Sequence, residues 1–402
     1  MTAAGKRMKP EPFIIHAEQA MLDDLERRLQ ATRWADDIAN DDWSSGTNAS
    51  YLRELTDYWL NHFDWRTQER AMNAFSHFRV LLDGIPIHFI HQKGVGGHAM
   101  PLILTHGWPW TFWDFAKVIG PLTDPAAHGG DPADAFDVVV PSLPGFGYSS
   151  PLRQSGVDAR VTANLWRKLM VEILGYPRFA AHGGDWGAFV TAQLGHKYPK
   201  DVLGIHMIGG APLDCFGKPL PDASAYAADE AGWHARTQAF FATESGYSAE
   251  QSTKPQSLAY GLQDSPVGLA AWLVEKRHGW SDCGGDVARR FTKDELLTSI
   301  MIYWLTGTIG TSARYYYENR KAGWRPSHDG ARMVDVPTGC LKLEADVCHW
   351  PRSLMEANFD LQRWTRSAVG GHFAPAEVPD LVVSEIRDFF RPLRRNEQED
   401  QR

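Results

Sequence analysis

Cysteine is scarce in this chain. Four cysteines occur among 402 residues, namely Cys215, Cys283, Cys340 and Cys348, and they form neither a Cys-x-x-Cys pair nor a zinc-binding spacing. A disulfide-stapled secreted scaffold is therefore not indicated, and we expect free thiols in a cytoplasmic protein. The segment 1–11 has no apolar stretch typical of a signal peptide, and no apolar run is long enough to span a bilayer.

Positive charge is also in short supply. The sequence has 41 Lys and Arg against 49 Asp and Glu, which gives a formal net charge of -8. This balance disfavours nucleic acids and anionic membrane surfaces as partners. Compact metal motifs such as His-Glu-x-x-His are missing, and the loop 144–147 lacks the third glycine of a dinucleotide-binding fingerprint. We therefore expect no metal ion and no organic cofactor.

What the sequence does contain is an alternation of short apolar strands and helices, which indicates a parallel α/β sheet. The expected strands are 101–105, 136–141, 178–182, 203–207, 338–343 and 364–369, and helices are expected at 186–198 and 379–390. Earlier in the chain, helical spacing of apolar residues predicts helices at 17–32 and 51–63. A hairpin then follows, with strands 78–82 and 85–91 joined by the turn pair Asp83-Gly84.

These patterns divide the chain into regions. Residues 1–94 are interpreted as a helical extension with a hairpin, and 95–211 with 335–395 as the α/β core. The stretch 212–334 is helix-rich, loop-rich and rich in Trp and Tyr, so it is interpreted as a lid inserted into the core. Residues 396–402 form a polar tail.

The most informative segment is Gly183-Gly184-Asp185-Trp186-Gly187. It has the small-x-nucleophile-x-small form of the nucleophile elbow, the sharp turn between a strand and a helix in α/β-hydrolases. Its centre is a carboxylate, and the chain contains no Gly-x-Ser-x-Gly. A carboxylate attacks an electrophilic carbon and leaves an alkyl ester on the enzyme, which is different chemistry from that of a serine esterase. A tight Asp-containing turn is the alternative when this segment is taken alone.

Two further segments fit the same chemistry. His106-Gly107-Trp108-Pro109 follows a strand, where an oxyanion loop is expected, and its backbone N–H groups would act together with the amide of Trp186. Gly370-Gly371-His372-Phe373 follows the last expected strand, so His372 is the candidate base that activates water. An acid must orient this histidine, and Glu344 and Asp346 both qualify by position.

With these motifs, nearly the whole chain resembles the microsomal-type epoxide hydrolases of the α/β-hydrolase superfamily. The segment around Asp64-Trp65-Arg66 is similar to the N-terminal domain of that family. The most specific similarities are long lid stretches, at 245–247, 264–272, 303–309 and 314–319. The resemblance implies an α/β-hydrolase fold with a mostly parallel sheet, a helical lid and an N-terminal helical extension.

The resemblance also implies a mechanism. Asp185 opens the epoxide by attack on a ring carbon, while Tyr247 and Tyr316 hydrogen-bond to the epoxide oxygen and donate a proton. His372 and its acid then activate water, and a vicinal diol is released. Tyr316 has a tyrosine on each side, and because neighbouring side chains of a helix point in different directions, only Tyr316 is expected to face the pocket.

The chain departs from the family pattern at two places. Counting from 336–339 places the acid on Asp346, with Glu344 at a position where proline is usual. Trp110-Thr111 follows Pro109 where the family has Gly-Ser, and this change is expected to narrow the mouth of the pocket.

Two other functions share part of this pattern. A haloalkane or haloacid dehalogenase shares the aspartate, the oxyanion loop and the histidine, but it needs halide-holding donors and no tyrosine pair. A non-catalytic ligand-binding hydrolase fold would be expected to lack a catalytic residue, yet all are present. The expected substrates are a small apolar or aromatic epoxide and water, and a homodimer is one assembly compatible with the sequence.

Overall fold

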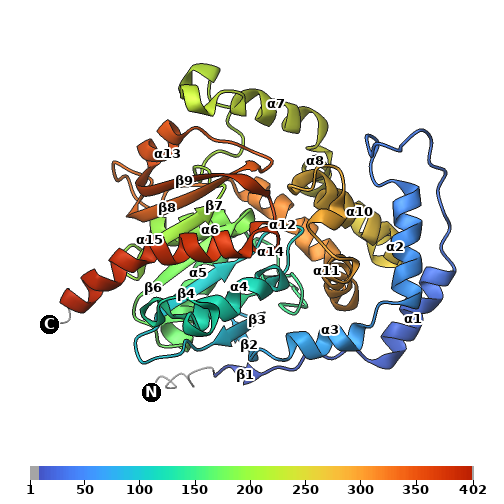
Figure 1. Ribbon diagram of the computed structural model, residues 1–402, viewed down its shortest axis with the longest axis horizontal. Helices are drawn as coiled ribbons and strands as arrows, with labels where there is room; N and C mark the ends of the chain where they lie inside the picture. Colours follow the sequence, from blue (N-terminus) through green and yellow to red (C-terminus); the bar gives the residue numbers. More distant parts are fainter. Residues whose placement is uncertain (1–8, 401–402) are drawn as a thin grey trace.

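The structure is a computed structural model that describes residues 9–400, with side chains described as far as residue 394. The predictions for the extreme N-terminus and for the polar tail at 396–402 lie outside the fully described residues. Within this range one sheet has the strand order β1-β2-β3-β5-β4-β6-β7-β8-β9 (Figure 1). The strands are β1 (Glu11–Pro12), β2 (His77–Leu82), β3 (Ile85–Gln92), β4 (Met100–Thr105), β5 (Phe136–Pro141), β6 (Phe179–Gly184), β7 (Val202–Ile208), β8 (Val334–Ala345) and β9 (Phe359–Gly371).

The sheet is mostly parallel, which confirms the predicted fold class. β1, β2 and β3 pair antiparallel with their neighbours, and β3 joins β5 antiparallel. From β5 onward every neighbouring pair is parallel. The central strands β5, β6 and β7 are buried along their whole length, as expected for strands covered on both faces.

Helices cover both faces of this sheet. On β7, a side chain added at Gly204 would meet Leu393 of α15, whereas the next residue, Ile205, packs against Gly195 of α6. Because successive residues of a strand point to opposite faces, α15 and α6 lie on opposite sides. The helices of the core are α4 (Ala116–Thr123), α5 (Ala159–Arg167), α6 (Trp186–Lys197), α13 (Arg352–Asn358), α14 (Ala374–Glu377) and α15 (Pro379–Asp400).

A group of helices between β7 and β8 lies over the edge of the sheet where the parallel strands end (Figure 1). They are α7 (Trp233–Thr243), α8 (Gly246–Thr253), α9 (Pro255–Asp264), α10 (Pro266–Trp280), α11 (Lys293–Thr306) and α12 (Ile309–Ala322). They occupy the stretch interpreted as a lid. The exact domain boundaries stay a prediction.

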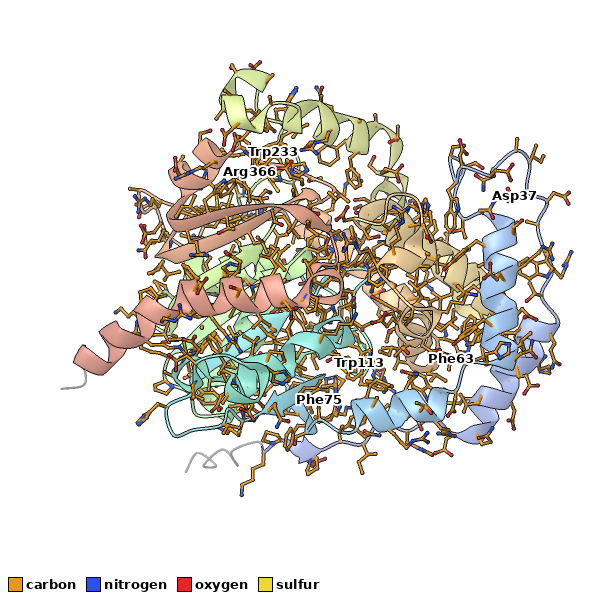
Figure 2. All side chains as sticks on the ribbon, in the orientation of Figure 1. Asp37, Phe63, Phe75, Trp113, Trp233 and Arg366 are labelled. Atoms are coloured by element: carbon orange, nitrogen blue, oxygen red, sulfur yellow. The ribbon has the colours of Figure 1, made fainter. Side chains whose placement is uncertain are left out.

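The N-terminal helices support this lid. They are α1 (Gln19–Gln30), α2 (Ala49–Asn61) and α3 (Trp65–Met72), and α1 and α2 lie beside α10 and α11 (Figure 1). The hydroxyl of Tyr58 donates to Asp294 of α11 at 3.0 Å, and that of Thr47 donates to the carbonyl of Ala271 at 2.6 Å. Closer to the sheet, Phe75 meets Trp113 edge to face, with ring centroids 5.9 Å apart (Figure 2). The N-terminal extension is thus built onto the lid as well as onto the sheet.

Two negative expectations can be compared with the structure. Cys215, Cys283, Cys340 and Cys348 are all free thiols. Of the helices within residues 9–400, none combines the length and the apolar character needed to cross a membrane.

Candidate active site

Asp185 occupies a strained turn between β6 and α6. Its φ is 53° and its ψ is -129°, a backbone conformation that residues other than glycine rarely adopt. The flanking glycines are required because the backbone is crowded. A side chain at Gly187 would collide with the carbonyl of Thr105 on β4, and one at Gly183 would collide with the carbonyl of Gly187. The small residues of the motif therefore let the turn close against the neighbouring strand.

The loop after β4 holds one oxygen of the Asp185 carboxylate. The backbone N–H of Trp108 donates to Asp185 Oδ1 at 2.8 Å. A side chain at Gly107 would collide with that carboxylate, so glycine is required there. His106 anchors the loop, since its Nδ1 donates to the carbonyl of Gly107 at 2.9 Å and its Nε2 accepts from the N–H of Leu143 at 3.0 Å. Burial lowers the pKa of His106 to about 4, so its imidazole stays neutral.

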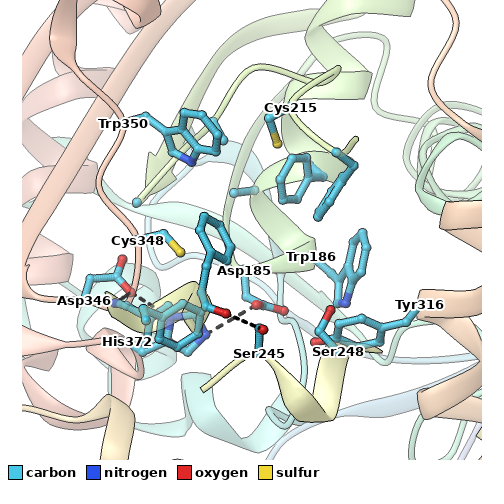
Figure 3. Close-up of a pocket in the computed structure, with 18 of the residues that line it drawn as sticks. Asp185, Trp186, Cys215, Ser245, Ser248, Tyr316, Asp346, Cys348, Trp350 and His372 are labelled. Atoms are coloured by element: carbon cyan, nitrogen blue, oxygen red, sulfur yellow. Dashed lines mark hydrogen bonds and ion pairs between the residues drawn. The ribbon is translucent and has the colours of Figure 1, made fainter. Parts of the chain in front are cut away.

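His372 lies between two carboxylates (Figure 3). Its Nδ1 is 2.8 Å from Oδ1 of Asp346, and its Nε2 is 3.4 Å from Oδ2 of Asp185. Burial acts to lower the pKa of His372, but the two carboxylates outweigh it and raise the pKa to about 10. Burial would likewise raise the pKa of Asp346, yet the hydrogen bond and charge of His372 lower it to about 2. In the free enzyme these groups form an imidazolium between carboxylates.

The lid holds the loop that carries His372. The backbone N–H of His372 donates to the carbonyl of Trp280, at the end of α10, at 2.8 Å. One turn earlier on α10, the buried guanidinium of Arg277 lies 3.9 Å from the ring centroid of Phe373. The same guanidinium pairs with the buried carboxylate of Asp114, just beyond the oxyanion loop, at 2.7 Å. Helix α10 therefore links the two loops that flank Asp185.

The carboxylate of Glu344 belongs to a separate network of hydrogen bonds and ion pairs. It accepts from Arg236 at 2.7 Å, from Arg366 at 2.7 Å and from the indole of Trp233 at 3.0 Å. Burial would raise the pKa of Glu344, but these donors lower it to about 2. Arg366 also lies over the Trp233 ring, 4.5 Å from its centroid (Figure 2). The structure thus brings Asp346 into contact with His372 and uses Glu344 to tie the lid helix α7 to the sheet.

The two candidate tyrosines enter the same cavity from the lid. Tyr247 stacks on Trp108 with centroids 5.2 Å apart, and Tyr316 meets Trp186 edge to face at 4.9 Å. The centroids of the two tyrosine rings are 5.8 Å apart. Burial, with the charge of Asp185 among the further causes, raises the pKa of both phenols above the ordinary value, so they hold their protons. The neighbour Tyr315 does not line the cavity, and its hydroxyl lies 2.9 Å from that of Thr162.

The cavity has a volume of about 400 Å³ and is mostly apolar. Asp185, Asp346, His372, Tyr247 and Tyr316 all reach it, and its other walls include Trp186, Phe189, Phe216, Phe240, Phe241 and Trp350 (Figure 3). Among the residues with described side chains, there is no cluster of three or more His, Cys, Asp or Glu that could hold a metal ion. The site is thus a carboxylate beneath two phenols in an apolar chamber.

Trp110 does not narrow the mouth of this cavity, so that expectation was wrong. Its side chain is fully buried beneath the site, where it meets the His372 ring edge to face at 5.6 Å. Its carbonyl accepts from the hydroxyl of Tyr303 at 2.8 Å. The indole fits under the catalytic loops because Gly184 has no side chain, and an added Cβ at that position would collide with it.

Sequence reasoning missed several residues of the cavity wall. They are Ser245 just before α8, Ser248 and Ser252 of α8, Arg320 of α12, and Cys215, Phe216 and Cys348 in loops. The serines recur at helical spacing around Tyr247, and Arg320 lies one turn after Tyr316. Both spacings are visible in the sequence once the tyrosines are singled out.

Family models match most of the chain. Residues 10–115 match the model described as "Epoxide hydrolase N terminus", and residues 100–285 match "alpha/beta hydrolase fold". A Stigmatella aurantiaca protein named "Putative epoxide hydrolase" is 42% identical over 384 residues, which span 95% of this chain and 85% of the relative. Epoxide hydrolase 1 of Sus scrofa is 35% identical, with 96% of this chain and 90% of the relative covered.

Solved structures show the same similarity. The structure of Aspergillus niger epoxide hydrolase has a TM-score of 0.84 and 27% identity, covering 96% of this chain and 97% of that one. The crystal structure of juvenile hormone epoxide hydrolase from the silkworm Bombyx mori has a TM-score of 0.85 and 26% identity, covering 97% and 96%. The similarity therefore includes the N-terminal helices and the lid as well as the core.

Proposed function

This chain belongs to the epoxide hydrolase family of the α/β-hydrolase fold and hydrolyses epoxides to diols, and we propose that Asp185 is its covalent nucleophile. The observation that supports this role best is the unequal placement of the two Asp185 oxygens. Oδ1 accepts the 2.8 Å hydrogen bond from Trp108 and Oδ2 lies 3.4 Å from His372, while the Asp185 side chain borders the cavity. Family membership favours this chemistry over that of a dehalogenase.

In the first step, Oδ2 of Asp185 attacks a ring carbon of the epoxide. A C–O bond of the oxirane breaks, and its electron pair goes to the epoxide oxygen. Tyr247 or Tyr316 delivers a proton to that oxygen, because their buried phenols stay protonated well above neutral pH. The product is a hydroxyalkyl ester on Asp185.

In the second step, water attacks the ester carbonyl carbon. Oδ1 then carries the developing negative charge and already accepts from the N–H of Trp108, and we assign the N–H of Trp186, at the start of α6, as the second donor in the transition state. Collapse of the tetrahedral intermediate breaks the bond between Cγ and Oδ2. The diol leaves with Oδ2, and Asp185 keeps Oδ1 and the oxygen of water.

His372 changes its role between the two steps. Before alkylation, its pKa of about 10 keeps it protonated beside two carboxylates. Ester formation removes the charge of Asp185, so one of the causes that raise this pKa is lost and burial counts for more. His372 can then release its proton, which restores the phenol that protonated the epoxide oxygen, and the neutral imidazole accepts a proton from the attacking water, while Asp346 stabilises the imidazolium that results.

The walls favour an apolar or aromatic substituent on the epoxide. Phe189, Phe216, Phe240, Phe241 and Trp350 line the cavity around the carboxylate, and aromatic walls bind aromatic rings well. Four free thiols, two of them in the cavity wall, support a reducing cytoplasmic location. The same mechanism applies to a monomer and to a homodimer.

Product analysis tests the proposed function. Purified protein is incubated with styrene oxide and, separately, with a chloroalkane of similar size, and the diol and chloride released are measured. Diol without chloride release is expected. Chloride release at a comparable rate would support the dehalogenase, and neither product would support a non-catalytic role for the fold. Asp185→Asn serves as the inactive control.

A further inference from the structure

A second chamber adjoins the catalytic cavity. It has a volume of about 380 Å³ and shares a wall with the first, formed in part by Trp186, Phe189 and Phe216. The polar part of the shared wall comes from the lid, where Ser248 and Ser252 of α8 face both chambers together with Arg320 of α12. A substrate anchored at the catalytic tyrosines can therefore place a second group at this polar part of the wall.

Arg320 is a charge on this wall without a partner among the described residues. The other charged groups are paired. Asp158 of the second chamber accepts from Arg160 at 2.8 Å, and Asp185 and Asp346 of the first flank His372. The exposed guanidinium of Arg320 on the wall of an apolar chamber offers a positive charge and a fork of N–H donors, the donor geometry that binds carboxylates.

Hydroxyl donors lie on the helix that faces Arg320. Ser248 and Ser252 are one turn apart on α8, which packs against α12, and neither hydroxyl has a hydrogen-bond partner among the described residues. Ser245, at the N-cap of this helix, differs because its hydroxyl donates to the carbonyl of Phe241 at 2.6 Å. The two free hydroxyls and the guanidinium are the donor types that a carboxylate accepts.

The position of Arg320 sets the length of the ligand. Tyr316 and Arg320 are four residues apart on α12, so they lie on one face of the helix, with their Cα atoms about 6 Å apart along its axis. We propose that Arg320, with Ser252 beside it, binds a carboxylate carried by the substrate. The preferred substrates are then epoxides with an anionic group about one helical turn, roughly 6 Å, from the oxirane ring. This proposal rests on the epoxide hydrolase function and on Tyr316 as a proton donor.

Stabilisation of the helix end is the other role that a cation at this place can have. Arg320 lies in the last turn of α12, where a positive charge interacts favourably with the helix dipole and stabilises the helix. Lys321 lies in the same turn, but its ammonium is placed over the ring of Tyr317, 5.9 Å from the centroid, and it lines neither chamber. Lys321 therefore shares the helix-end role without the proposed binding role, which makes it a matched control.

The test compares 4-carboxystyrene oxide with its methyl ester. In this pair a rigid ring separates the epoxide from the carboxylate, and the ester removes the charge while adding one methyl group. We measure kcat/KM for both compounds and take the ratio of acid to ester. Arg320→Gln is expected to lower this ratio about fivefold, the size expected for a partly exposed charge pair, whereas Lys321→Gln leaves it within about twofold. Arg320→Lys keeps the charge and is expected to restore part of the ratio.

Calorimetric binding of the two diol products gives a reading that does not depend on turnover. The acid diol is expected to bind the parent protein more tightly than the ester diol, and Arg320→Gln is expected to remove that difference. Equal ratios and equal binding in Arg320→Gln and Lys321→Gln would overturn the carboxylate site while leaving epoxide hydrolysis intact. Failure to hydrolyse any epoxide, the neutral ester included, would instead reject the proposed function. Thermal melting of each variant shows that a change in ratio is not caused by unfolding.

Discussion

The backbone N–H of Trp108 donates a 2.8 Å hydrogen bond to Oδ1 of Asp185. This contact distinguishes the two oxygens of the nucleophile before any substrate binds. Oδ1 lies where a carbonyl oxygen must be stabilised during ester hydrolysis, and Oδ2 faces His372 across 3.4 Å. In the proposed mechanism, the oxyanion loop therefore decides which oxygen attacks and which stays with the protein.

The close approach of Gly107 to this carboxylate predicts the effect of one added methyl group. A Cβ at position 107 would collide with the Asp185 side chain, so Gly107→Ala must displace the nucleophile or the loop. We expect kcat/KM to fall by about two orders of magnitude or more, comparable to loss of an oxyanion-hole donor. Gly97→Ala is the control, because open space surrounds that position. Activity in Gly107→Ala within a few-fold of the parent would contradict this geometry.

Substitutions at Asp346 and at Glu344 are expected to have different effects, the first on ester hydrolysis and the second on stability. Asp346→Asn removes the negative partner of the His372 imidazolium, so hydrolysis of the ester should slow by about three to four orders of magnitude while alkylation is less affected. Glu344→Gln weakens the contacts with Arg236 and Arg366, so its melting temperature should fall while the ester is still hydrolysed. Pre-steady-state kinetics with styrene oxide separates the two steps. The reverse order of effects would place the catalytic acid on Glu344.

The two phenols are expected to share one task. Replacing either Tyr247 or Tyr316 by phenylalanine should slow alkylation by about ten- to a hundredfold, since general acid catalysis by one phenol remains. The double variant should lose most alkylation. Tyr315→Phe is the control, because its hydroxyl meets Thr162 outside the cavity. Near-normal single-turnover alkylation in the double variant would remove the proton-donor role.

The protonation of His372 should depend on the charge of Asp185. The pKa of His372 is raised from 6.5 to about 10 in the free enzyme, so its stabilising contribution is complete below pH 6.5 and is lost as the pH rises through about 10. Asp185→Asn removes one carboxylate and mimics the uncharged ester, so the pKa of His372 should fall. Ring-proton NMR of His372 during a pH titration measures both values. An unchanged or higher pKa in Asp185→Asn would contradict the proposed change of role.

Much of the framework could be predicted because it depends on local patterns. Strands β4 to β7 are apolar along their length and were predicted to within about two residues. The elbow was recognised because Gly183 and Gly187 satisfy a local steric requirement. Strands β8 and β9 were predicted too short, since Arg363 and Arg366 interrupt the apolar pattern of β9 and pair with Glu385 and Glu344 instead.

Other features depended on contacts between residues far apart in the sequence. Glu344 qualifies as the acid by its position in the sequence. Its carboxylate instead binds Arg236, which lies 108 positions away in the chain. Trp110 follows the oxyanion loop in sequence, yet its indole turns beneath the site, because Gly184 leaves room for it there. No pattern of neighbouring residues reveals such pairings.

Covalent attack by Asp185 is tested most directly by a single turnover in heavy-oxygen water with enzyme in excess over styrene oxide. Water that attacks the ester carbonyl delivers its oxygen to Asp185, so the first diol should be unlabelled and mass spectrometry should find the label on the peptide containing Asp185. His372→Ala, which can still be alkylated, should accumulate the adduct on that peptide. A labelled first diol with an unlabelled Asp185 would show that water attacks the epoxide directly, and the covalent mechanism would be rejected.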